Sequence, residues 1–168
     1  MKYTVEINNG INLPVNIDID FVNNYKNSDV IEKFRKEHEY TEQAAQILFN
    51  ELKKYLIICA SYRKGYPPSK SIDHIWHTFI LFTMDYSKFC ESAFGRYIHH
   101  APNIGNTANR LKIEPFEVTI LALKETFSNF NEHFWVHLAP GDGDEDDDNG
   151  CTHNDCGPVT DDIHDPDK

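Results

Sequence analysis

DHIWHTFILFTMDYSKFCESAFGRYIHHAP, residues 73–102, is the stretch of the chain that decides the fold. It contains four of the nine histidines in the sequence and one of the two tryptophans. Its pattern predicts two helices, over about 72–82 and 84–94, with Ser71 or Asp73 at the start of the first, Thr83 as cap of the second and Gly95 as its stop. Because the connection between them is very short, the helices either fold back as a hairpin or form one bent helix.

Apolar residues at spacings of three and four extend this helical pattern to both sides of the stretch. They predict further helices over about 28–38, 41–65 and 115–127. Ser28 and Thr41 are suitable N-caps for the first two, and Pro115 suits the first position of the third. Apolar residues cover much of the perimeter of the long helix over 52–60, so we expect this helix to be central.

The two ends of the chain differ from the helical middle. Residues 1–20 alternate between apolar and polar types around Asn8-Asn9-Gly10, which predicts a small N-terminal β-hairpin. After Pro140 no hydrophobic pattern continues, so we expect residues 141–168 to be a disordered acidic tail. The fold class is therefore mainly α: a single helical domain of about five helices over 1–140, with the hairpin at its start and the tail after it.

The net charge of −11 is concentrated in that tail. Residues 142–168 contain eleven acids and one base, which leaves a body close to neutral. Because nucleic-acid binding needs a basic stripe, we expect no nucleic-acid partner, and a basic protein as partner for the acidic tail. No apolar run is long enough to span a membrane and no secretory signal is visible, so the sequence predicts a cytoplasmic protein.

Helix geometry divides the site candidates within 73–102 into faces. Asp73, Trp76 and His77 share one face, at spacings of three and four residues, and Tyr86 and Cys90 share another. His99 and His100 follow after one irregular turn. Carboxylate, imidazole and thiolate ligands suit zinc, and imidazole with carboxylate also suits iron or copper. The predicted ligands of a divalent metal are Asp73, His77, Cys90, His99 and His100.

Three neighbours of these ligands are expected to support the site. Trp76 is the packed wall that holds the helix, Tyr86 is a donor either at the rim or behind the ligands, and His74 lies at the margin, about 60° from His77 around the helix. Alternatively Asp73 orients a ring nitrogen of His77 without binding the metal. A buried polar network without metal and metal-free catalysis also fit the pattern, and no catalytic residue is assigned.

Further histidines and cysteines lie outside the stretch. His133 and His137 are four residues apart and are expected to be structural. Cys151, His153 and Cys156 stand among the acids of the tail and make only a weak zinc or copper motif, because no second ligand pair completes it.

The motif Asp73-x-x-Trp76-His77-Thr78-x-Ile80-Leu81, followed by Tyr86, Cys90, Phe94-Gly95 and His99-His100-x-Pro102, resembles the glycine-rich domain-containing-protein-like family. The resemblance covers about 30 residues closely and about 41–127 loosely. It implies a mostly helical domain whose motif residues act together, and it implies no activity. The chain departs from the family at Phe79, where many members have histidine.

These observations predict a divalent-metal-binding protein with a His/Asp/Cys site and no assigned reaction. A metal-dependent hydrolase or oxidoreductase is one alternative, since an open coordination position would permit catalysis. A metal-free interaction module, with the histidines as a structural network, is the other.

Overall fold

The structure is a computed structural model that describes residues 4–13, 16–62, 66–102, 116–135 and 156–159. The described part is mainly α, as the sequence predicts. Its elements are α1 (Ile19–Asn24), α2 (Ser28–His38), α3 (Glu42–Ser61), α4 (Lys70–Leu81), α5 (Thr83–Phe94), α6 (Phe116–Thr126), the 3₁₀ helix η1 (Glu132–Trp135), and the strands β1 (His99–Pro102) and β2 (Cys156–Val159).

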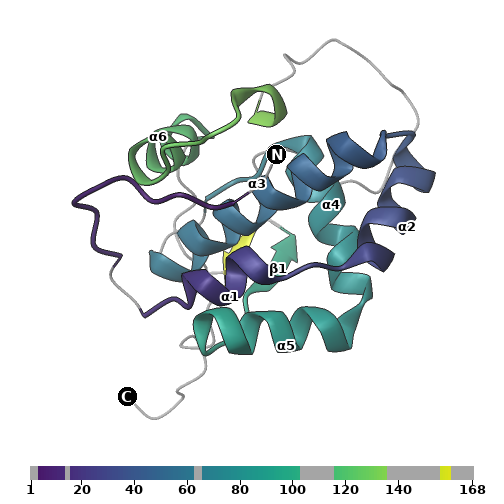
Figure 1. The fold of residues 1–168 in the computed structure, drawn as a ribbon, viewed down its shortest axis with the longest axis horizontal. Coiled ribbons are helices and arrows are strands. Elements are labelled where there is room, and N and C mark those ends of the chain that lie inside the picture. Colours follow the sequence, from purple (N-terminus) through teal and green to yellow (C-terminus); the bar gives the residue numbers. More distant parts are fainter. Residues whose placement is uncertain (1–3, 14–15, 63–65, 103–115, 136–155, 160–168) are drawn as a thin grey trace.

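Helix α3 is the centre of the fold, and the prediction of a central helix is confirmed. Every residue from Leu48 to Ser61 is buried. Helices α2 and α4 pack on one side of it and α6 on the other, while α5 runs below α4 (Figure 1). The burial includes charged side chains, and the ammonium of Lys54 lies 2.6 Å from a carboxylate oxygen of Glu51. The centre of the domain therefore contains an ion pair as well as apolar packing.

The chain turns between α4 and α5 at Phe82, whose backbone is not helical (φ −84°, ψ 63°). Helix α5 packs back against α4, with the Phe79 ring 5.1 Å from Tyr86 and 5.5 Å from Phe89 between ring centroids. This arrangement of two separate helices in contact excludes the alternative of one bent helix. It sets the two predicted site faces against a common core.

Helix ends agree with the sequence except in their caps. Thr41 caps α3 as predicted, and Gly95 ends α5 in the left-handed region at φ 68°. The other predicted caps are wrong: Asn27 caps α2, Ser69 caps α4, and α5 has no side-chain cap. In α2 and α4 the observed cap lies one or two residues before the predicted one. An N-cap residue precedes the first helical residue, and its side chain accepts a hydrogen bond from an amide two or three residues further on.

The predicted N-terminal hairpin is not formed by the described residues 4–13 and 16–20. The turn is present, with Gly10 at φ 85° and the Ile11 amide donating to the Asn8 carbonyl. Residue Ile7, however, forms an isolated antiparallel bridge with Phe127, and the second predicted strand contains the start of α1. The extended segment around Ile7 thus forms its backbone hydrogen bonds with the residues at the end of α6, and not with a second strand of a hairpin.

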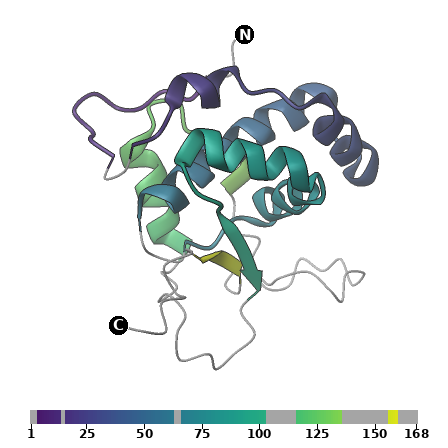
Figure 2. The same cartoon turned by 90° about the horizontal axis from the view of Figure 1, so that it is seen from below.

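Most of the predicted disordered tail lies outside the described residues, but Cys156–Val159 is a correction to it. This segment forms β2, which pairs antiparallel with β1, and the two lie side by side in Figure 2. Pro158 pairs with His100 and Pro102 with Cys156. Opposite residues of an antiparallel ladder alternate between pairs that exchange N–H···O bonds and pairs that do not. The two pairs that contain proline belong to the same set. Because proline has no N–H to donate, this set fits the pairs without hydrogen bonds.

No helix in the described ranges is long and apolar enough to cross a lipid bilayer.

Candidate metal centre

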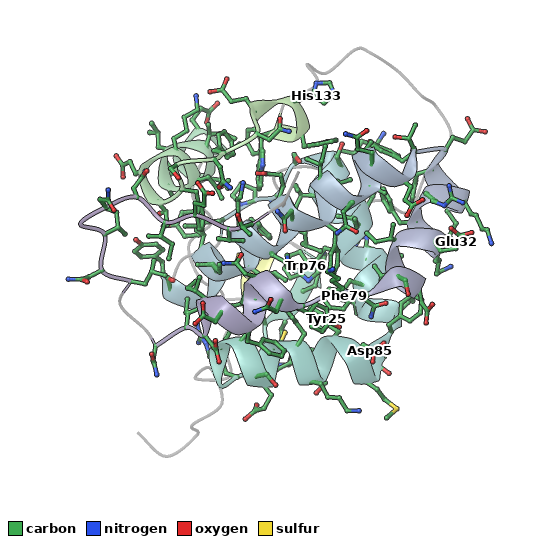
Figure 3. The ribbon with its side chains drawn as sticks, in the orientation of Figure 1. Tyr25, Glu32, Trp76, Phe79, Asp85 and His133 are labelled. Atoms are coloured by element: carbon green, nitrogen blue, oxygen red, sulfur yellow. The ribbon has the colours of Figure 1, made fainter. Side chains whose placement is uncertain are left out.

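Helix α4 holds the first half of the site. The Ser69 hydroxyl accepts the Ile72 amide and donates to the Phe134 carbonyl at 2.6 Å, so the start of the helix is fixed to η1. Asp73 and His77 follow one turn apart, and His77 Nδ1 lies 3.5 Å from Asp73 Oδ2. Trp76 lies between them in sequence and is fully buried near the centre of the molecule (Figure 3). The helix therefore presents both side chains from a rigid, packed base.

Strand β1 supplies the second half. After Gly95 ends α5, Arg96 donates to the Ala60 carbonyl at the end of α3. The chain then runs along α4, and His100 Nε2 lies 2.8 Å from Asp73 Oδ1. The His100 ring centroid is 4.4 Å from that of His77 and 4.3 Å from Trp76. His100 is thus the histidine of the pair that faces Asp73.

Asp73, His77 and His100 offer ligand atoms that all lie within 4.8 Å of one another. The side chains of Asp73 and His100 are 7% and 6% exposed, whereas that of His77 is 43% exposed. Burial lowers the pKa of His77, the neighbouring His100 adds to that effect, and Asp73 opposes it. The imidazole of His77 therefore favours its neutral form, which is the form that binds a metal.

The spacing of these atoms can be compared with that of ligands around a tetrahedral zinc ion. Two ligand atoms about 2.0–2.1 Å from a tetrahedral zinc ion are roughly 3.3 Å apart. The 3.5 Å between Asp73 and His77 matches that separation, and the 2.8 Å between Asp73 and His100 is shorter by about half an ångström. Two imidazoles and a carboxylate on one side, with His77 facing solvent, leave further coordination positions for water or a substrate.

Tyr86 is fully buried next to Trp76, so of its two expected places the rim of the site is wrong and a position behind the ligands fits. Its hydroxyl accepts a hydrogen bond from Trp76 Nε1 at 3.0 Å and donates to the Ile98 carbonyl at 2.6 Å. Burial raises its pKa well above the usual value, and the Cys90 thiol adds to this. Tyr86 therefore stays neutral and joins α4, α5 and the start of β1.

The structure does not bring Cys90 into the cluster of Asp73, His77 and His100. Cys90 is buried beside Tyr86 and the Ile98 backbone. Burial raises the pKa of its thiol to about 11, and the hydrogen bonds with Ile98 and Tyr86 only partly oppose that rise. A thiol that stays protonated is a poor ligand, so the ligand role of Cys90 stays a prediction that this geometry does not favour.

His99 and His74 also lie outside the cluster. The His99 ring contacts Tyr97, with centroids 4.6 Å apart, and its ligand role stays a prediction. His74 stacks on His38 of α2 at 5.0 Å, with the ring planes 16° apart. Burial and the charge of His38 lower the pKa of His74. His74 is thus an α2–α4 contact, at the margin of the site as expected.

Among the remaining candidates, His133 is exposed on η1, at the edge of the molecule in Figure 3. His137, Cys151 and His153 lie outside the described residues, and Cys156 is in β2. Sequence reasoning missed Ile98, which contributes through its peptide groups. A backbone role of this kind cannot be recognised from the residue type. The only signal in the sequence was that Tyr86 and Cys90 share one helix face and could contact the same segment.

Fold and site together define a helical domain that presents two histidines and one aspartate, from a helix and a strand, on a packed aromatic base. The chain belongs to the UCP032817-like family, whose model matches residues 18–113, more than half of the sequence. That range contains the whole of the cluster. The family is uncharacterised, so membership assigns no activity. No curated protein and no solved structure matches the chain.

Proposed function

We propose that the chain binds a divalent transition-metal ion through Asp73, His77 and His100. The observation that carries the proposal is the convergence of three ligand atoms within 4.8 Å, from two segments separated by a whole helix. A carboxylate with two neutral imidazoles is a donor set for zinc, and also for iron or copper. We favour zinc, because the 3.5 Å between Asp73 and His77 is close to the separation of two ligand atoms around a tetrahedral zinc ion.

The exposure of His77 favours a site with an open position over a closed structural one. Structural zinc sites have four protein ligands, whereas catalytic sites have three and a water. We therefore retain a metal-dependent hydrolase or oxidoreductase as the reaction class that such a site would permit. The donor set alone selects no substrate.

The second candidate is a metal-free module in which the cluster is a structural network. The contact that favours it is the 2.8 Å hydrogen bond between His100 and Asp73, which satisfies both buried groups without an ion. In that case the acidic tail, which includes 142–155, is the part that would recruit a basic partner. A cytoplasmic location and kinship with the glycine-rich domain-containing-protein-like family also remain proposals.

Metal analysis of tag-free protein tests the first candidate against the second. We expect zinc, iron or copper to co-purify at about one ion per chain. Added Co²⁺ at 100 times its dissociation constant should stabilise the metal-free protein by about 2.7 kcal/mol, because the ion binds only the folded state. For a chain of this size that corresponds to a rise in melting temperature of roughly 5–10 °C. Absence of both a bound ion and a thermal shift would overturn the metal proposal.

A further inference from the structure

The carbonyl group of Ile98 is held by a side chain of α5. The Tyr86 hydroxyl donates to the Ile98 carbonyl at 2.6 Å. The Cys90 thiol is buried on the same face of α5, beside the backbone of Ile98. Tyr86 and Cys90 are one helical turn apart, fully buried, and contact each other as well. Both side chains lie against the backbone of Ile98 from one face of α5.

The held residue lies two positions before His100. In an extended chain, residues two apart are about 6.6 Å from each other and point to the same side. A fixed Ile98 carbonyl therefore limits the positions that the His100 ring can take. The same Tyr86 hydroxyl also accepts from Trp76, which lies on α4 between Asp73 and His77. One hydroxyl thus connects the two halves of the metal centre.

We propose that Tyr86, with the buried Cys90 thiol beside it, forms a positioning clamp that holds His100 beside Asp73. The inference rests on the proposed metal binding and deepens it. It gives the Tyr and Cys of the motif a role behind the ligands, where residues that orient a ligand are worth about 10–100-fold in metal affinity.

The rival explanation is that both side chains only fill the core. The chain offers matched controls for it on α3. Tyr55 is fully buried and its hydroxyl also donates to a carbonyl, that of Tyr66, at 2.5 Å. Cys59 is a second fully buried thiol, and burial raises its pKa too. Neither of these polar groups hydrogen-bonds Ile98, so each pair of variants loses similar chemistry at a different place.

The experiment compares Tyr86→Phe and Cys90→Ala with Tyr55→Phe and Cys59→Ala in the full chain. Co²⁺ affinity is measured by competition with a chromophoric chelator, and stability by thermal unfolding of the metal-free protein. We expect Tyr86→Phe to weaken binding by about 10–100-fold and Cys90→Ala by about 10-fold. The two controls should lose comparable stability, but their Co²⁺ affinity should stay within about threefold of that of the parent. Equal affinity of Tyr86→Phe and the parent would overturn the clamp.

A metal-free measurement keeps the clamp testable apart from the metal proposal. The His100 ring lies edge-on to Trp76, with centroids 4.3 Å apart, so its proton NMR shifts report their relative position. We expect these shifts to move in Tyr86→Phe and to be retained in Tyr55→Phe. If the parent binds no Co²⁺, the proposed function fails and the ring shifts alone decide the clamp. Unchanged shifts in Tyr86→Phe would reject it in either case.

Discussion

Replacing His77 and His100 by alanine, one at a time, should separate metal binding from folding. The two side chains bind the same carboxylate but differ in burial: that of His77 is 43% exposed and that of His100 is 6% exposed. The 3.5 Å contact of His77 with Asp73 is partly screened by solvent, so its loss should cost at most about 1 kcal/mol of unfolding free energy. The His77→Ala protein should therefore fold much like the parent.

Removal of His100 has a different cost, because it leaves the buried Oδ1 of Asp73 without its 2.8 Å partner. An unsatisfied buried polar group costs about 1–3 kcal/mol. We expect His100→Ala to lose about 1–3 kcal/mol in the metal-free state. Both variants lose one of three ligands, so both should also lose the stabilisation by Co²⁺.

The assay is urea unfolding followed by circular dichroism, with EDTA and then with Co²⁺, and His133→Ala is the matched control. His133 is exposed on η1 and outside the cluster, so its replacement should leave both unfolding curves unchanged. Retention of the full Co²⁺ stabilisation by His77→Ala would refute the three-ligand site. A His77→Ala protein as unstable as His100→Ala would refute the assignment of their separate roles.

Other predictions concern the parts that hold the site in place. Burial lowers the pKa of Lys53 to about 8. Because the unfolded lysine keeps its proton to a higher pH, the contribution of Lys53 to stability should rise between about pH 8 and 10.5, by at most about 3 kcal/mol, and urea titrations should show it as the difference between the parent and Lys53→Met. Glu51→Gln or Lys54→Met should each cost about 3–5 kcal/mol in urea unfolding, and the double variant should cost less than the sum, since the buried partner is no longer left unpaired. Asn27→Ala should cost about 1 kcal/mol in the same assay and Ser28→Ala much less, because Asn27 caps α2; the opposite ranking would contradict the cap assignment.

The helical part of the fold could be predicted because its signal is local. The spacing of apolar residues follows from 3.6 residues per turn, and α2 to α5 begin within one or two residues of their expected starts. The N-terminal segment could not be predicted in this way. Its turn at Gly10 is a local feature and is present, but the partner of Ile7 is Phe127, more than a hundred residues away. Alternation in a sequence predicts an extended chain and leaves its partner open.

The candidate site shows the same division between local and distant information. That Asp73 and His77 share a face follows from helix geometry, and so does the pairing of Tyr86 with Cys90. The choice between His99 and His100 depends on which side of β1 faces α4, since neighbouring residues of a strand point to opposite sides. Cys90 was expected to be a ligand, yet it is buried beside Tyr86, whose hydroxyl holds the carbonyl of Ile98 just ahead of the strand that carries His100.

This arrangement explains why the motif is spread over a whole helix. Asp73 and His77 are placed by α4 alone, because one rigid turn fixes their separation. His100 has no such local constraint, and its strand must be held by contacts from other elements. Helix α5 provides one through the Tyr86 hydroxyl, while Arg96 ties the same connection to the end of α3. The residues between the ligands thus supply the geometry that the third ligand cannot obtain from its own segment.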